Sequence, residues 1–191
     1  FFAYCSFVDP HHPFDPPKPY GEMYDPDALE VPVRMEGELL DKPPHFRKAL
    51  TARGFSNEKY DYRKLKDHQW GQIKAAYYGM ITLIDDNIGR ILDALRKNGV
   101  EKDTLILFTN DHGELLGDHG LLFKGPFHYD CIIKAPMIIK WPGVVPQGSR
   151  YSQVTEHVDI MPTLLEYAGV RPPYGVQGCS MAPILRGDKG A

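Results

Sequence analysis

The chain has 191 residues, with 22 Lys or Arg against 25 Asp or Glu, and its formal net charge at pH 7 is −3. Because this charge is small and negative, it gives no reason to expect nucleic acid or an anionic membrane as a partner. The 42% hydrophobic content predicts one folded, soluble domain or most of one, and it excludes a disordered or collagen-like chain.

The first expected element is a buried strand over residues 1–8, an aromatic-rich apolar run that stops at Asp9-Pro10 and would deliver His11 at its carboxyl end. This run is far shorter than the roughly 20 residues of a membrane span. Residues 13–65 follow as a long loop region rich in Pro, Asp and Gly. Within it, residues 42–66 carry eight Lys or Arg and two Asp or Glu, which make either a solvated basic face or an anion-collecting rim.

Helices and strands alternate in the rest of the chain. Apolar residues spaced three or four apart predict one long helix over 66–98, and the apolar run 104–109 predicts a strand buried on both faces. A second strand is expected at 136–140 and a helix at 159–167. This order is typical of an α/β fold with a mainly parallel sheet.

The reactive side chains follow the ends of predicted strands, where open α/β sheets bind their ligands. Asp111 and His112 form an Asp-His-Gly turn after the strand 104–109, and a carboxylate beside an imidazole can bind one divalent cation. Lys124 offers a compact positive charge to a tetrahedral oxyanion, and His11 can give a proton to a departing oxygen. Alone, each of these residues is equally compatible with a structural role.

Longer motifs resemble the type I sulfatases of the alkaline phosphatase superfamily, which hydrolyse sulfate esters, over nearly the whole chain. The matching segments are Pro10-His11-His12-Pro13-Phe14, the stretch 108–121 around Asp111-His112-Gly113, Lys124 thirteen residues beyond Asp111, Asp159-Ile160-Met161-Pro162-Thr163, and 178–187.

The resemblance implies a fold and a set of roles. The fold is part of an alkaline-phosphatase-like sandwich, with a mainly parallel central sheet flanked by helices. His11 and Lys124 become catalytic and substrate-binding residues, His12 lines the substrate pocket, and Asp111 and His112 become metal ligands. The metal is one divalent ion, with calcium first and manganese, magnesium or zinc as alternatives. For His119, His128 and His157, structural roles are favoured over roles in the site, and both stay open.

One departure from the family pattern concerns the nucleophile. The family uses a formylglycine made from Cys or Ser in a Cys/Ser-x-Pro-x-Arg motif upstream of the His-Pro-Phe segment, and neither Cys5, Cys131, Cys179 nor any serine meets it. Residues 1–191 are therefore expected to be the C-terminal portion of a sulfatase catalytic domain that is inactive alone. In it, 13–65 is the substrate-side loop region, 66–98 the long helix, and 104–124 the metal- and sulfate-binding strand and turn.

Two alternatives stay open. A phosphonate or phosphate ester hydrolase of the same superfamily would present a similar oxyanion to the same metal and lysine. A non-catalytic fragment could instead hold sulfated glycans through residues 42–66. For the sulfatase, the expected substrate is a sulfate ester of a carbohydrate or an aryl group, and a periplasmic or secreted location is favoured over a cytoplasmic one. The oligomeric state is not predicted.

Overall fold

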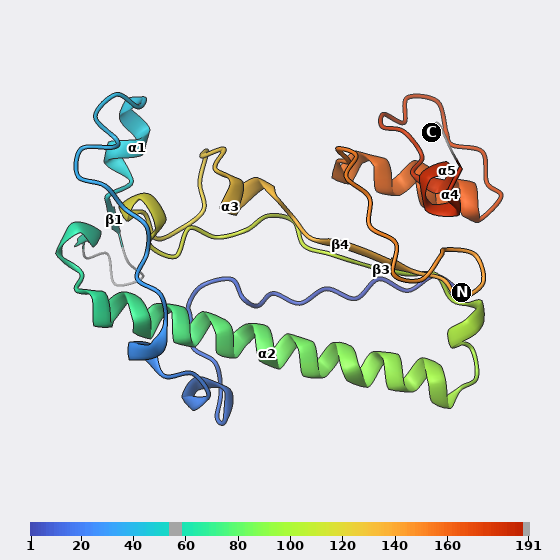
Figure 1. Cartoon of the computed structure of the whole chain (residues 1–191), viewed down its shortest axis with the longest axis horizontal. Coiled ribbons are helices and arrows are strands. Elements are labelled where there is room, and N and C mark those ends of the chain that lie inside the picture. The colour runs from blue at the N-terminus through green and yellow to red at the C-terminus, as the bar shows by residue number, and fades with distance from the viewer. Residues whose placement is uncertain (54–58, 189–191) are drawn as a thin grey trace. The chain divides into compact units, whose positions relative to one another are not determined.

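The computed structural model describes residues 1–53 and 59–188, which form two compact units. The first unit contains residues 1–94 and 112–134, and the second contains residues 95–111 and 135–191. Figure 1 shows the helices and strands of both units.

The long helix α2, Asp67–Lys97, lies where the apolar stripe over 66–98 predicts a helix, and all but its last three residues belong to the first unit. One face of α2 carries glycine where a loop packs on it. A Cβ at Gly71 would collide with the carbonyl oxygen of Pro26, so the absence of a side chain lets this loop contact the helix backbone directly.

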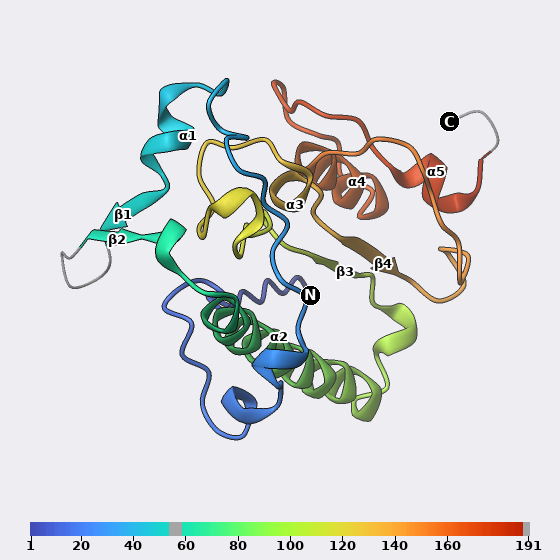
Figure 2. The same ribbon diagram turned by 60° about the vertical axis from the view of Figure 1, so that its left-hand side comes forward.

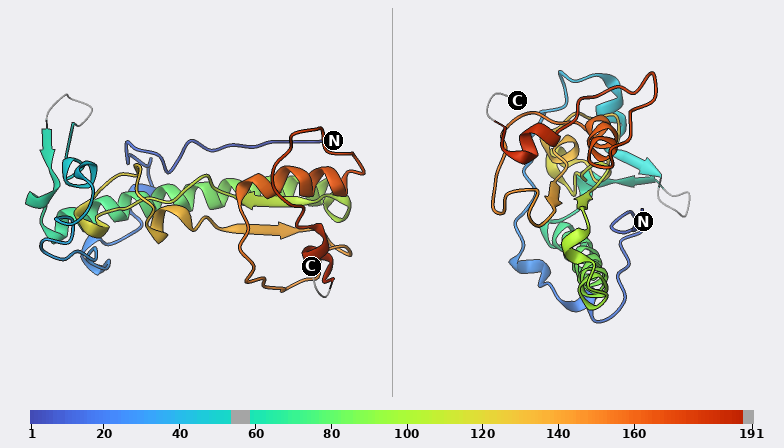
Figure 3. Two further views of the ribbon diagram at one scale, coloured as in Figure 1. Left: turned by 90° about the horizontal axis from the view of Figure 1, so that it is seen from above. Right: turned by 90° about the vertical axis from the view of Figure 1, so that its right-hand side faces the viewer.

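Residues 1–8 run as an extended segment beside α2 in the first unit (Figures 1 and 3). The prediction of a buried strand here is wrong, because the segment is not a strand and Phe1 and Phe2 are 90% and 83% exposed. A strand needs a neighbour for its backbone hydrogen bonds, and no segment in the described part of the chain pairs with this one.

Residues 13–65 contain short elements joined by loops, in the part that the structure describes. They include three 3-10 helices, Tyr20–Glu22, Pro26–Ala28 and Tyr62–Lys64. They also include α1, Pro44–Lys48, and an antiparallel pair of β1, Thr51–Arg53, with β2, Lys59–Asp61 (Figure 2). Arg47 of α1 donates hydrogen bonds to the carbonyl oxygens of Leu39, Leu40 and Lys42 at 3.4, 2.8 and 3.2 Å, so its guanidinium ties the preceding loop to the helix.

Two hydrophobic clusters hold the first unit together, and the segment 113–124 contributes to both. Leu115 and Leu121 are buried in one cluster, and Leu122 is buried in the other beside Trp70. The helix α3, Asp130–Ile133, adds Ile132 to the first cluster. The turn that follows the predicted metal ligands therefore has buried leucine side chains before and after it, and their packing holds the turn in place.

In the second unit, β3, Ile106–Thr109, and β4, Met137–Lys140, pair antiparallel with Ile106 opposite Lys140. A parallel strand buried on both faces was expected at β3, and neither feature is found. Both sheets in the described residues are antiparallel pairs, and Phe108 and Ile138 are exposed. A parallel neighbour needs a crossover connection, whereas these two strands pair directly with each other.

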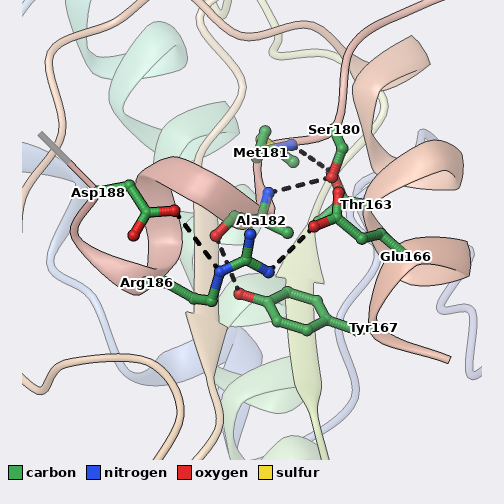
Figure 4. A network of polar contacts seen from close by, with 8 residues as sticks. All are labelled: Thr163, Glu166, Tyr167, Ser180, Met181, Ala182, Arg186 and Asp188. Carbon is green, nitrogen blue, oxygen red and sulfur yellow. Dashed lines mark hydrogen bonds and ion pairs between the residues drawn. The ribbon is translucent and has the colours of Figure 1, made fainter. Parts of the chain in front are cut away.

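The second unit also contains α4, Ile160–Tyr167, and α5, Ala182–Arg186 (Figure 4). The Asp-x-x-Pro-Thr motif joins them. Asp159 accepts hydrogen bonds from the backbone N–H of Glu156 and of Cys179, at 2.9 and 2.8 Å. Thr163 Oγ1 donates to the Asp159 carbonyl at 2.6 Å and accepts from the backbone N–H of Met181 at 2.8 Å. The polar residues of this motif therefore stabilise the contact between α4 and the segment that precedes α5.

Two further observations concern sequence expectations. Among the described residues, no helix has both the length and the apolar character that crossing a membrane requires. Cys5, Cys131 and Cys179 are all free thiols.

Candidate active site

Four of the five sequence-predicted site residues, His11, His12, His112 and Lys124, lie in the first unit. Asp111 is the last residue of the 95–111 stretch in the second unit, two residues after the end of β3, and it is exposed. The expectation that reactive groups follow strand ends thus holds for Asp111. His11 follows an extended segment instead of a strand.

The ring of His11 is oriented by a hydrogen bond to the backbone of the next residue. Its Nδ1 lies 2.7 Å from the carbonyl oxygen of His12, and a carbonyl can only accept a hydrogen bond. Nδ1 therefore carries a proton, and Nε2 is the ring atom that can exchange a proton with another molecule. The exposed position of His11 leaves it accessible from solvent.

His12 is a half-buried ring at the centre of an aromatic group. Its ring centroid lies 4.1 Å from that of His11 in a stacked arrangement and 4.4 Å from that of Phe123, the residue before Lys124. Phe14 meets His12 edge-on at 6.4 Å. Burial lowers the pKa of His12, and the positive charges of His11 and Lys124 lower it further, which favours a neutral ring.

The turn at His112 is shaped by hydrogen bonds on its own chain. His112 Nδ1 donates to the carbonyl oxygen of Gly113 at 2.8 Å, which places the lone pair of the neutral ring on Nε2, as a metal ligand requires. Gly113 N–H donates to the carbonyl oxygen of Ile132 at 2.8 Å, and a Cβ at Gly113 would collide with the carbonyl of Cys131. Only glycine fits this close backbone approach.

Glu114 contacts the candidate site at Lys124 and was not predicted from the sequence. Its Oε1 accepts hydrogen bonds from the backbone N–H of Lys124 and, at 3.3 Å, of Leu115. Burial raises the pKa of Glu114, while these N–H groups and the charges of Lys124 and His112 act in the opposite direction. The Asp-His-Gly-Glu run contains the residue, but nothing in a single sequence shows that its partner is ten residues away.

The remaining histidines differ in their surroundings. His119 Nδ1 lies 2.7 Å from Glu38 Oε2, and its ring stacks on Tyr129 at 3.8 Å, so His119 joins two loops of the first unit. His157 Nε2 lies 3.4 Å from Thr109 Oγ1 in the second unit. His128 is exposed. The contacts of His119 agree with the structural role predicted for it.

The donor set fits one divalent cation in part. A carboxylate at Asp111 and an imidazole with its lone pair on Nε2 at His112 are both ordinary ligands of such ions. Within residues 1–53 and 59–188, no group of three or more His, Cys, Asp or Glu side chains is arranged to hold a metal.

Comparison with solved structures defines the class. The fold is that of the alkaline-phosphatase-like hydrolase domains: the phosphonate monoester hydrolase of Silicibacter pomeroyi superposes with a TM-score of 0.81 at 34% identity, covering 95% of this chain and 36% of that one. A second structure, described as a complex with its substrate D-glucosamine-2-N,6-O-disulfate, is 37% identical with a TM-score of 0.60, covering 63% of this chain and 24% of that one.

The chain belongs to the sulfatase family, whose model matches residues 1–170. It is also 38% identical to an arylsulfatase of Clostridium perfringens over 189 residues, which cover 97% of this chain and 37% of that protein. The chain thus spans little more than a third of the relatives that it matches. The resemblance inferred from the motifs is confirmed, as is the α/β fold class, and members of this family use a divalent metal.

Proposed function

We propose that the protein containing this chain hydrolyses sulfate esters. The observation that carries the proposal is the arrangement of the first unit around His12, whose ring contacts both the ring of His11 and that of Phe123, the residue before Lys124. A sulfate ester needs a cation for its anionic oxygens and an acid for its leaving alcohol. These residues supply both.

In this proposal each residue has a defined task. Lys124 pairs with the sulfuryl oxygens. His11, in its doubly protonated form, donates the Nε2 proton to the alcohol oxygen as the sulfur–oxygen bond breaks, and it keeps the Nδ1 proton on the His12 carbonyl. His12 lines the pocket between them. Asp111 and His112 would bind the divalent metal, which neutralises charge on the sulfuryl oxygens when bound. The formylglycine expected upstream would supply the attacking hydroxyl, so we propose that residues 1–191 alone are inactive.

Calcium is the metal that we propose first, with manganese, magnesium and zinc as alternatives. Carboxylate oxygens favour calcium, whereas the imidazole of His112 is a ligand that manganese and zinc also accept. Chelation of the full-length protein should abolish sulfate ester hydrolysis, and single-metal addition should restore it. Full recovery with zinc and none with calcium would contradict this order.

A sulfated carbohydrate is the substrate class that we propose. The support is a similar solved structure that holds a sulfated glucosamine. The sequence-based preference for a periplasmic or secreted location is kept as part of this proposal. Release of inorganic sulfate from sulfated glucosamines, compared with a simple aryl sulfate, tests the substrate class, and turnover of the aryl sulfate alone would contradict it.

Phosphonate monoester hydrolysis is the second candidate, favoured by the structural match to the Silicibacter pomeroyi enzyme. Both substrates present a tetrahedral oxyanion to a metal and a lysine. The test compares kcat/KM of the full-length protein for 4-nitrophenyl sulfate and for an aryl phosphonate monoester. The sulfatase proposal predicts the larger value for the sulfate, and a tenfold preference for the phosphonate would overturn it.

The binding-fragment alternative is weakened at one of its residues. Arg47, part of the proposed glycan surface, uses its guanidinium on three backbone carbonyls. Lys48 is exposed, while the side chain of Arg53 and residues 54–58 lie outside the described part of the chain. Salt-sensitive binding to a sulfated polysaccharide that Lys48→Glu abolishes would favour this alternative.

A further inference from the structure

We infer that Glu114 is a positioning residue, which holds Lys124 beside the turn of His112 so that its ammonium group meets the sulfate. This inference rests on the proposed sulfatase function. It concerns a residue to which neither the motifs nor the family resemblance gives a role.

The inference starts from the path of the backbone between the two groups. Leu116 N–H donates to the carbonyl of Leu122 at 3.0 Å, and Gly117 N–H donates to the carbonyl of Leu121 at 2.8 Å. These two hydrogen bonds join the two arms of the turn between Glu114 and Lys124. Glu114 adds a further contact between the arms with its side chain, because Oε1 accepts the backbone N–H of Lys124.

The other end of the contact is equally fixed. Gly113 is hydrogen-bonded to Ile132, and Leu115, which is 1% exposed, anchors the following residue in the core. The same Oε1 of Glu114 also accepts the N–H of Leu115. One carboxylate oxygen therefore connects a rigid turn to the residue that carries the anion-binding ammonium group.

The surroundings of Glu114 make the loss of its hydrogen bond to Lys124 unfavourable. The side chain of Glu114 is partly buried, and the positive charge of Lys124 acts on its carboxylate. Without the side chain, the N–H of Lys124 would lose its acceptor at a partly buried position, where water replaces it incompletely. We expect the segment around Lys124 to shift as a result.

The test uses the full-length protein with 4-nitrophenyl sulfate as substrate and inorganic sulfate as competitive inhibitor. Glu114→Ala is expected to raise both KM and the sulfate Ki about tenfold or more. Glu114→Gln keeps Oε1 as an acceptor and should stay within about threefold of wild type. Glu114→Asp, whose side chain is one methylene shorter, keeps the charge and should resemble Glu114→Ala; it replaces that variant if Glu114→Ala does not fold.

Glu38→Ala is the matched control, because Glu38 likewise accepts a backbone N–H, that of Met35, and its other carboxylate oxygen pairs with His119. It should lower thermal stability and leave the sulfate Ki unchanged. If Glu114→Ala and Glu114→Asp leave KM and Ki unchanged, or if Glu114→Gln is as defective as Glu114→Ala, the positioning role is wrong. Failure of the wild-type protein to hydrolyse the ester would instead refute the proposed function.

Discussion

The imidazole of His11 is held by its donation from Nδ1 to the His12 carbonyl, which directs Nε2 toward proton transfer. A general acid matters most when the leaving alcohol is a weak acid, because such an oxygen needs its proton in the transition state. His11→Gln should therefore lower kcat for an alkyl or sugar sulfate by about 10²- to 10⁴-fold. For 4-nitrophenyl sulfate the loss should be much smaller. Equal losses on the two substrates would contradict the acid role.

His12 supports a different prediction, because it contacts His11 and Phe123 through the face of its ring. A neutral aromatic ring of similar size should keep this packing. His12→Phe is expected to keep kcat/KM for an aryl sulfate within about threefold, whereas His12→Ala should lose about tenfold or more, since aromatic contacts and burial are both removed. A His12→Phe variant as impaired as His12→Ala would show that the ring nitrogens contact substrate.

At the scale of residues, the sequence indicated candidate site residues better than it indicated the atoms that they contact. The motifs singled out His11, His12, Asp111, His112 and Lys124 as candidates, and of these only Asp111 and His112 follow the end of a strand in the structure. Glu114 was not predicted, because the role that we infer for it depends on a hydrogen bond from the backbone N–H of Lys124, ten residues away. A sequence does not show which side chains bind backbone groups.

At the scale of elements, Thr163 fastens α4 to the segment before α5 (Figure 4). Its hydroxyl is buried, at 1% exposure, and it satisfies the backbone N–H of Met181. Thr163→Val should cost about 1–3 kcal/mol of stability, because it leaves that N–H without an acceptor. Thr163→Ser keeps the hydroxyl and should cost clearly less. Denaturant or thermal unfolding of the two variants measures the difference, and equal stabilities would exclude the fastening role.

Asp159 makes the stability of the contact between α4 and the segment before α5 depend on pH. The backbone N–H groups of Glu156 and Cys179 hold the pKa of Asp159 below its ordinary value, against a smaller effect of burial. A lowered folded-state pKa gives stability that is present above the ordinary carboxyl pKa, about 3.9, and is lost as pH falls through the folded-state value. Wild type should unfold at a higher temperature than Asp159→Asn at pH 7, and the gap should close in acid. A gap that widens below pH 4 would contradict this sign.

The helices α2 and α4 were predictable from the sequence to within one residue at their ends, while the short helices α1, α3 and α5 and the strand partners were not. The stripe of α2 and the turn of α4 are local patterns of spacing and capping. The pairing of β3 with β4 and the exposed course of residues 1–8 depend on which segments lie side by side. An apolar run looks the same in the sequence whether or not a neighbour pairs with it.

At the scale of the whole molecule, the chain spans 37% of the arylsulfatase that it matches, and the activity that we propose is one of the full-length protein. Family membership is carried by the match over residues 1–170, and the site proposal is carried by the geometry around His12. The roles proposed for Lys124, Asp111 and His112 also draw on the family motifs, so the family match and the site proposal are not independent.

The most direct test measures kcat/KM of the full-length, metal-loaded protein for an aryl sulfate, in wild type and in Lys124→Ala and Asp111→Ala. If Lys124 binds the sulfuryl oxygens and Asp111 binds the metal, each variant should lose well over tenfold in kcat/KM while remaining folded by thermal unfolding. A loss below about tenfold in either variant, equivalent to ~1.4 kcal/mol of transition-state stabilisation, would contradict the assigned roles.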